Sequence, residues 1–449
     1  MFGASLSRWT MSYFAAALCA LLGAEVLMAA GVGFPSQPLA APLTLVLVHL
    51  VAIGWLSLLL SGALIQFVPV LVAKPLAHPE LPVVALALLL AGLGSLLFGF
   101  LDMAGLSVGS MPWLPLGAIG LAGGFALNLW NLGRTLWSAR PIGLAARFVA
   151  VGLVSLIGVV TLGTIFSLTL SGWTTNAAFL RLTSEGIPLH AALGLGGWLT
   201  FTAMGVSYRL LAMFMLAPEA EHRSSRIALL AGTVAILVIL IGGPVCILIF
   251  DQGVIHPLLA AFALALVSLA LYGQDIVRLY RTRKRPKIEL NARVFAWALG
   301  SLGLAVLLLV AASARGPTDR QIGGVVFLFV FGWLTGLGLA KLYKIVAFLT
   351  WLECYGRLLG KRPTPRVQDL VDESRAMPWF WLYFTGVGVA SLAVFLSAPM
   401  VFRGAAFAML IATARICFEL VLTRNLTAVP AAMLPDGYRA WPRLHLPIL

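Results

Sequence analysis

Long apolar runs separated by short polar connections repeat along nearly the whole chain. Each run is long enough, at about 20 residues, to cross the hydrocarbon core of a bilayer as a helix. Lipid offers the backbone no hydrogen-bond partners, so runs of this length are expected to be helical. The twelve predicted helices cover residues 10–33, 42–73, 82–104, 112–136, 142–171, 187–216, 226–250, 255–280, 291–313, 321–352, 378–399 and 402–424.

The composition agrees with this pattern. Of the 449 residues, 61% are hydrophobic and only 10% are charged. A water-soluble protein cannot cover so much apolar surface, whereas a bilayer accepts it. We therefore expect an all-α polytopic membrane protein that forms a single membrane domain over residues 1–449. The first apolar run is too long for the core of a cleavable signal peptide and predicts a first membrane anchor.

The net charge of +14 is distributed unevenly among the connections. Lysine and arginine are concentrated after the even-numbered helices, with the densest group in residues 278–287. The positive-inside rule therefore predicts that both termini and the even-numbered connections are cytoplasmic. The expected location is a bacterial-type inner membrane. A loop beside anionic lipid accounts for the basic group, so no nucleic-acid partner is expected.

A motif of small, aromatic and polar residues occurs three times at long intervals. It reads G-W-L-[ST]-x4-[GA]-x3-[QRK], and its tryptophans are Trp55, Trp198 and Trp333. Each copy lies in the second helix of a group of four, as expected for an internal repeat. The predicted repeat blocks, each of four helices, are about residues 1–140, 141–288 and 289–449.

Each part of the motif has a physical interpretation. The small residues would allow helices to approach closely in lipid. The tryptophan would fill space near the middle of the helix. The polar residue that ends each copy would lie toward the cytoplasmic interface, where a long side chain reaches water. These three polar residues are Gln66, Arg209 and Lys344.

Two of the six histidines lie in helices that carry the motif. His49 precedes Trp55 by six residues, and His190 precedes Trp198 by eight. In the predicted topology both lie in the outer half of the membrane. Neutral imidazole is a good ligand for haem iron and for copper. Metal ligation and simple hydrogen bonding to neighbours both remain open for this pair.

The stretches His49–Trp55 and His190–Trp198 resemble the HAHLxxLGW motif found in relatives of the haem-copper oxidase catalytic subunit, including nitric oxide reductases. A more distant resemblance is to NnrS-type membrane haem proteins. Lys341–Trp351 also resembles bacterial membrane proteins of this group. The superfamily has twelve helices in three pseudo-symmetric four-helix blocks, with metal ligands on helices two, six, seven and ten. The resemblance therefore implies a fold like that of haem-copper oxidase subunit I.

Several ligands of that superfamily are missing here. Val325 and Phe327 stand where helix ten carries H-x-H, and residues 226–250 lack the paired histidines that hold copper. The resemblance therefore implies that the usual dioxygen-reducing binuclear centre is lost and that no copper is bound. Few buried acids are present to relay protons, which argues against a proton pump. The main acidic candidates are Glu25, Asp102 and Glu419.

The pseudo-threefold of the superfamily predicts that His49 and His190 point toward each other. Together they would bind one haem b, as both cofactor-binding residues and metal ligands. Arg181, Arg209 or outer-loop groups would pair with the propionates. Two histidines on one iron favour a low-spin haem suited to electron transfer, whereas a labile ligand would allow nitric oxide to bind.

Three functions stay open from the sequence. The first is a membrane haem protein that handles electrons or a gas such as nitric oxide or oxygen. The second is a cofactor-free structural or assembly subunit of a respiratory membrane complex. The third is a metal or small-solute transporter, although transporter repeats usually come in two halves. The expected partners are the lipid bilayer and either other respiratory-complex subunits or a cytochrome. No catalytic residue is predicted.

Overall fold

The protein is an integral multi-pass membrane protein. The computed structural model describes residues 3–106, 109–218, 221–313, 316, 318–361 and 363–435. In this part of the chain all regular structure is helical, and twelve helices are long and apolar enough to cross a membrane. They are Arg8–Ala30, Pro42–Val72, Leu81–Met103, Trp113–Ser138, Leu144–Leu170, Ile187–Met215, Arg223–Leu248, Ile255–Thr282, Leu290–Ser313, Asp319–Tyr355, Glu373–Phe395 and Pro399–Arg424.

The predicted and observed ends of the helices differ where polar or glycine residues decide them. The first span ends at Ala30 instead of 33, because Gly31 adopts φ 82° and stops the helix. The eleventh begins at Glu373 instead of 378. Asp372 caps that helix by accepting hydrogen bonds from the backbone N–H groups of Ser374 and Arg375, both at 3.1 Å.

One additional helix lies in the connection between the fifth and sixth spans. Helix α7 (Ala177–Glu185) is too short and too polar to appear as an apolar run. Asn176 caps it by accepting hydrogen bonds from the backbone N–H groups of Ala178 (3.0 Å) and Phe179 (3.3 Å). Hydropathy alone does not predict this helix, because its nine residues are too few to form a membrane-spanning run.

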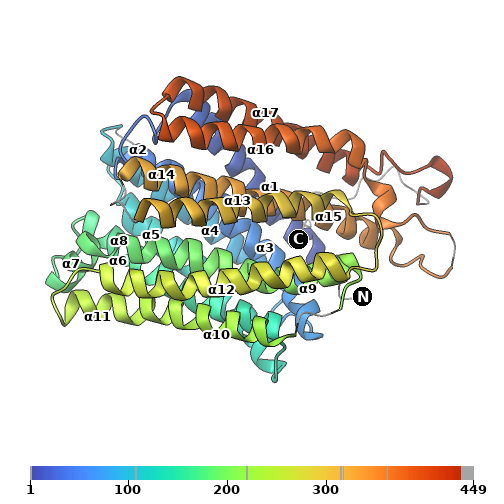
Figure 1. Ribbon diagram of the computed structural model, residues 1–449, viewed down its shortest axis with the longest axis horizontal. Coiled ribbons are helices and arrows are strands. Elements are labelled where there is room, and N and C mark those ends of the chain that lie inside the picture. Colours follow the sequence, from blue (N-terminus) through green and yellow to red (C-terminus); the bar gives the residue numbers. More distant parts are fainter. Residues whose placement is uncertain are drawn as a thin grey trace. The chain divides into compact units, whose positions relative to one another are not determined.

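The chain forms two compact units, and unit 1 comprises Met1–Gly62 and Ile288–Leu449. Within it α1 packs against α17, α13 packs against α15, and α16 lies beside α17 (Figure 1). The long α-helices of this unit are α1 (Gly3–Ala30), α13 (Leu290–Ser313), α15 (Gly336–Tyr355), α16 (Glu373–Phe395) and α17 (Pro399–Arg424). The shorter ones are α2 (Pro42–His49) and α14 (Asp319–Phe327), while α3 (Leu58–Val72) begins in this unit.

Unit 2 comprises Ala63–Lys287. Within it α4 packs closely on α5, α6 packs on α9, and α10 packs on α12. A Cβ atom added to Gly92 of α4 would lie 2.5 Å from the backbone nitrogen of Leu121 in α5, so this pair depends on a small residue. Its helices, besides α7, are α4 (Leu81–Met103), α5 (Trp113–Ser138), α6 (Leu144–Leu170), α8 (Ile187–Ala192), α9 (Thr202–Met215), α10 (Arg223–Leu237), α11 (Gly243–Leu248) and α12 (Ile255–Thr282).

The single domain and the three repeat blocks expected from the sequence stay predictions. The twelve spans themselves are present in the structure.

Candidate functional site

The three helices that carry the motif share an unusual local structure at the motif itself. Each changes from α-helix to π-helix there, over Leu50–Ser57, Leu193–Phe201 and Leu328–Thr335. π-Helical turns insert a residue into an α-helix and are enriched at functional sites. The similar backbone geometry supports the interpretation that the three sequence copies are a repeat. A further π-helical segment, Val238–Gly242, carries only apolar residues and glycine and no copy of the motif.

The motif tryptophans are packing residues, as predicted. Trp55, Trp198 and Trp333 are all buried. The indole N–H of Trp55 donates a hydrogen bond to the hydroxyl of Thr335 at 3.0 Å. This bond joins the tryptophan of the first copy to the threonine of the third, inside unit 1. Tyr383 of α16 donates to the carbonyl of Phe331 at 3.0 Å, within the same π-helical segment.

The second small position of the motif permits close contact between helices. A Cβ atom on Gly62 would lie 2.6 Å from Cβ of Tyr13, and one on Gly205 would lie 2.5 Å from Cβ of Phe148. Real Cβ atoms do not approach so closely, so both positions require glycine. The predicted role of these small residues is confirmed.

The polar residues that end the motif do not all reach water. Gln66 is only 7% exposed. Lys344 forms an ion pair with Glu289 at 2.8 Å, and their side chains are 11% and 12% exposed. The prediction of a side chain in water is therefore wrong for these two copies. Neighbouring helices cover the end of the motif, and Lys344 is neutralised by a carboxylate instead of by solvent.

His49 lies where α2 ends, directly before the π-helical segment Leu50–Ser57. Its Nδ1 atom is 2.8 Å from the carbonyl oxygen of Leu45. A carbonyl oxygen only accepts hydrogen bonds, so Nδ1 carries the proton. In a neutral ring the lone pair is then on Nε2. Metal-binding histidines commonly donate their other N–H to a carbonyl, which orients the ring.

His190 lies in α8, three residues before the π-helical segment Leu193–Phe201. Its ring packs beside Phe166 of α6, with ring centroids 5.5 Å apart. A Cβ atom on Gly163 would lie 3.2 Å from Cε1 of His190, so this glycine leaves room for the imidazole. The imidazole ring of His190 therefore packs against two residues of α6, Phe166 and Gly163, and all three residues belong to unit 2.

The two histidines belong to different units. His49 lies in unit 1 and His190 in unit 2. Their predicted roles as ligands of one haem, and their predicted orientation toward each other, therefore stay predictions. Within the described residues, no three His, Cys, Asp or Glu side chains converge as a metal-binding group would require.

The tenth span carries apolar packing at Val325 and Phe327, the two positions where the sequence lacks the expected histidines. Phe327 precedes its π-helical segment as His49 precedes the first one. Its ring stacks on Phe331 at 4.6 Å and meets Phe402 edge-on at 5.3 Å. Val325 is also buried. These two positions of the third copy thus make carbon contacts and offer no metal ligand.

Arg181, one of the candidate propionate partners, is already engaged. It donates hydrogen bonds to the carbonyl of Ile247 and to the carboxylate of Asp251, the latter at 2.5 Å. Both partners lie in unit 2, at the end of α11 and just after it. Arg181 therefore holds α7 against this end of the unit. Arg209 is half-buried in α9.

The acidic residues do not all behave as the sequence indicated. Glu25 and Glu419 are buried, but Asp102 is exposed at the end of α4. The prediction that Asp102 is a buried acid is therefore wrong, because this residue lies beyond the apolar part of its helix. The sequence analysis missed Asp275 of α12, which is 1% exposed. Its polar partners come from other helices, so no local pattern marks it.

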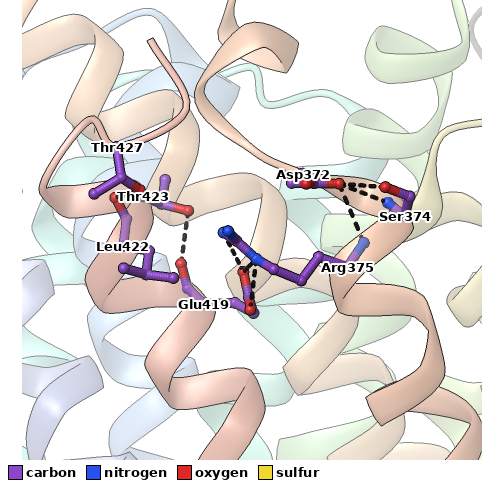
Figure 2. A network of polar contacts seen from close by, with 7 residues as sticks. All are labelled: Asp372, Ser374, Arg375, Glu419, Leu422, Thr423 and Thr427. Carbon is purple, nitrogen blue, oxygen red and sulfur yellow. Dashed lines mark hydrogen bonds and ion pairs between the residues drawn. The ribbon is translucent and has the colours of Figure 1, made fainter.

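Glu419 is neutralised by an arginine (Figure 2). Arg375 of α16 reaches α17 and places Nε 2.9 Å from both carboxylate oxygens of Glu419. Beside it, the hydroxyl of Ser374 donates to Asp372 at 2.5 Å and holds the pKa of that carboxyl below its usual range. This network joins the start of α16 to α17. The burial of Glu419 is therefore explained by its structural ion pair with Arg375.

No protein-family model matches the chain, and no curated protein matches it either. The family resemblance of the sequence therefore rests on the motif residues alone.

Proposed function

We propose that this chain is a membrane haem protein that transfers electrons or handles a gas such as nitric oxide or oxygen. In plan it would resemble haem-copper oxidase subunit I, with three four-helix blocks and without the usual binuclear centre. It would lie in a bacterial-type inner membrane with both termini in the cytoplasm. The twelve spans and the recurrence of a π-helical turn at each motif copy support this plan.

The observation that carries the proposal is the imidazole of His49. Its Nδ1–H is held by the carbonyl of Leu45 at 2.8 Å, which fixes the tautomer and the ring plane. Nε2 is then the nitrogen that would hold a haem iron. An imidazole oriented in this way fits an axial ligand of haem in unit 1. A bound haem b would supply reversible one-electron transfer or gas binding.

The surroundings of His190 also fit a ligand role in unit 2. The ring contact with Phe166 and the room left by Gly163 keep the imidazole in one position. A ligand held by packing in this way loses little freedom when it binds a metal. Copper is not proposed, because helix seven offers no histidine between residues 226 and 250.

Absorption spectra of the purified full-length protein, oxidised and reduced, test the proposal together with a pyridine haemochrome assay. We expect a low-spin b-type spectrum. His49→Ala and His190→Ala should each lower haem content at least about tenfold, since even residues that only support a metal ligand often contribute that much. His256→Ala is the matched control, because this exposed histidine lies in the first turn of α12 and its loss should leave haem content unchanged.

A monodisperse wild-type protein that lacks haem absorption after expression with added haem would overturn the proposal. So would normal haem content in both variants. The apolar cluster around Phe327 specifically favours one other function, a cofactor-free assembly subunit of a respiratory complex. That function predicts a colourless protein that co-purifies with other membrane subunits.

A further inference from the structure

Glu25 is an acidic residue inside a membrane-spanning helix, and it forms no ion pair with any of the described residues. It lies in α1, five residues before the helix ends at Ala30, which places it about 8 Å from the end at 1.5 Å per residue. Its side chain is 0% exposed. Ionisable residues at such depth are rare in membrane proteins and are commonly functional.

The two oxygens of the Glu25 carboxyl group have different surroundings. Oε1 accepts a hydrogen bond from the hydroxyl of Thr413 in α17 at 2.9 Å. Oε2 is buried and has no hydrogen-bond partner in the part of the chain that the structure describes. An ionised carboxylate would leave a full charge here with only one neutral donor. Such a charge is strongly disfavoured in a low-dielectric interior.

Among the described residues, no positively charged side chain forms an ion pair with Glu25. Arg403 of α17 reaches α1, but its Nε donates to the backbone carbonyl of Ala29 at 3.0 Å. Arg415 of the same helix packs on the rings of Trp379 and Phe418. Tyr383 of α16 and Cys417 of α17 lie within electrostatic range of the carboxyl group. Helices α2 and α15 also contact α1 and carry His49, Lys341 and Lys344. None of these three forms an ion pair with Glu25 among the described residues. Lys344 pairs with Glu289, and the ammonium of Lys341 lies 4.6 Å from the ring of Phe295.

We propose that Glu25 is a proton-binding site inside unit 1. One proton from water binds to Oε2 of the carboxylate and gives a neutral carboxylic acid, and no other bond changes. Oε1, which accepts the hydrogen bond from Thr413, is then the carbonyl oxygen of the acid. Loss of this proton would change the charge of the interior of unit 1 by one. This site needs no haem, so the proposal stands independently of the proposed function.

Infrared difference spectroscopy of the full-length protein, wild type minus variant, in a maltoside detergent that has no ester carbonyl groups tests the proposal. A protonated carboxyl group gives a C=O stretching band above the amide I band, whereas an ionised one does not. At pH 7, where exposed carboxyl groups are ionised, we expect this band in the wild type, with a shift to lower frequency in D₂O. Glu25→Gln should remove the band. Asp102→Asn, which changes an exposed carboxyl group, should leave it in place.

Thr413→Val provides a second test that retains the acid. It removes the hydrogen bond to Oε1, so the C=O band of Glu25 should move to higher frequency without losing intensity. Absence of a protonated carboxyl band in the wild type at pH 7 would overturn the proposal. A band that neither Glu25→Gln nor Thr413→Val alters would do the same. A band that appears only when sodium is removed would assign the site to a metal cation instead.

Discussion

Each unit buries one carboxyl group without an ion pair in the part of the chain that the structure describes, and the two are held differently. Asp275 in unit 2 accepts a hydrogen bond on each oxygen, from the hydroxyl of Tyr208 at 3.0 Å and from the hydroxyl of Ser224 at 2.5 Å. Glu25 in unit 1 accepts one, from Thr413, and its second oxygen has no partner among the described residues.

The difference separates a structural acid from a proton-binding one. The two hydroxyl groups around Asp275 come from α9 and α10, so the carboxyl group links three helices of unit 2. A second hydroxyl pair on α9 and α12 lies beside it, since the hydroxyl of Tyr272 is 2.7 Å from that of Ser207 and its ring packs edge-on against Tyr208. A fully bonded buried polar group stabilises its surroundings, whereas a partly bonded one costs free energy. Glu25 therefore requires another explanation, and a bound proton is the simplest one.

The largest expected effect is on stability. Asp275→Leu would leave two buried hydroxyl groups without their acceptor, and we expect a loss of about 2–5 kcal/mol in the free energy of unfolding. Glu25→Leu should cost about 1 kcal/mol or less, because an apolar residue replaces an incompletely bonded group. Thermal unfolding of the purified variants in one detergent measures both. An equal loss in the two variants would contradict the distinction between the acids.

Removal of the donors sharpens the same comparison. Tyr208→Phe should cost about 1–2 kcal/mol, because it removes one of the two hydrogen bonds to Asp275. Thr413→Val should cost about 0.5–1 kcal/mol, since it removes a single bond between neutral groups. In a background of Asp275→Leu, the cost of Tyr208→Phe should fall toward zero, which a double-mutant cycle detects. An unchanged cost in that background would show that Tyr208 acts through its packing instead.

The smallest effect is expected for a carboxyl group outside the membrane. Asp372→Ala removes the cap of α16 and should cost about 0.5–1 kcal/mol at neutral pH. The folded protein holds the pKa of Asp372 below its ordinary value, because Ser374 donates a hydrogen bond to it. Its stabilising contribution is therefore present above the ordinary pKa and is lost as the pH falls through the folded pKa.

Thermal unfolding of Asp372→Ala and the wild type at two pH values checks this expectation. The difference between them should be present at pH 7 and should shrink as the pH falls below about 4, the ordinary pKa of an aspartate. Ser374→Ala is the control, since it keeps the carboxylate and removes the hydroxyl donor. A stability difference between Asp372→Ala and the wild type that persists in acid would mean that Asp372 caps the helix without a negative charge.

The membrane spans could be predicted because each depends on a local property. A run of about 20 apolar residues is helical in lipid whatever lies beside it. The predicted ends of the helices were less accurate than the spans. Asp372 and Gly31 set helix ends through capping and backbone conformation, which hydropathy does not describe. Each of the three motif copies also lies at a π-helical turn, which the sequence did not predict.

The candidate ligands His49 and His190 came from the sequence alone, because a histidine within an apolar run stands out. The tautomer of His49 could not be predicted, because it depends on the distance to the carbonyl of Leu45. Asp275 was missed for a related reason. A carboxylate is recognised as structural only when the hydroxyl groups that bind it are known, and these lie on other helices.

The sequence by itself determined that this protein lies in a membrane, how many times it can cross, and where its motif repeats. These features follow from the transfer of contiguous residues into lipid and need no long-range contact. Only the tertiary structure decided which polar groups are satisfied. It brought Thr413 to Glu25 across 388 residues and left the other carboxyl oxygen without a partner among the described residues. Hydrogen bonds between distant segments depend on side-chain position, which no pattern along one helix contains.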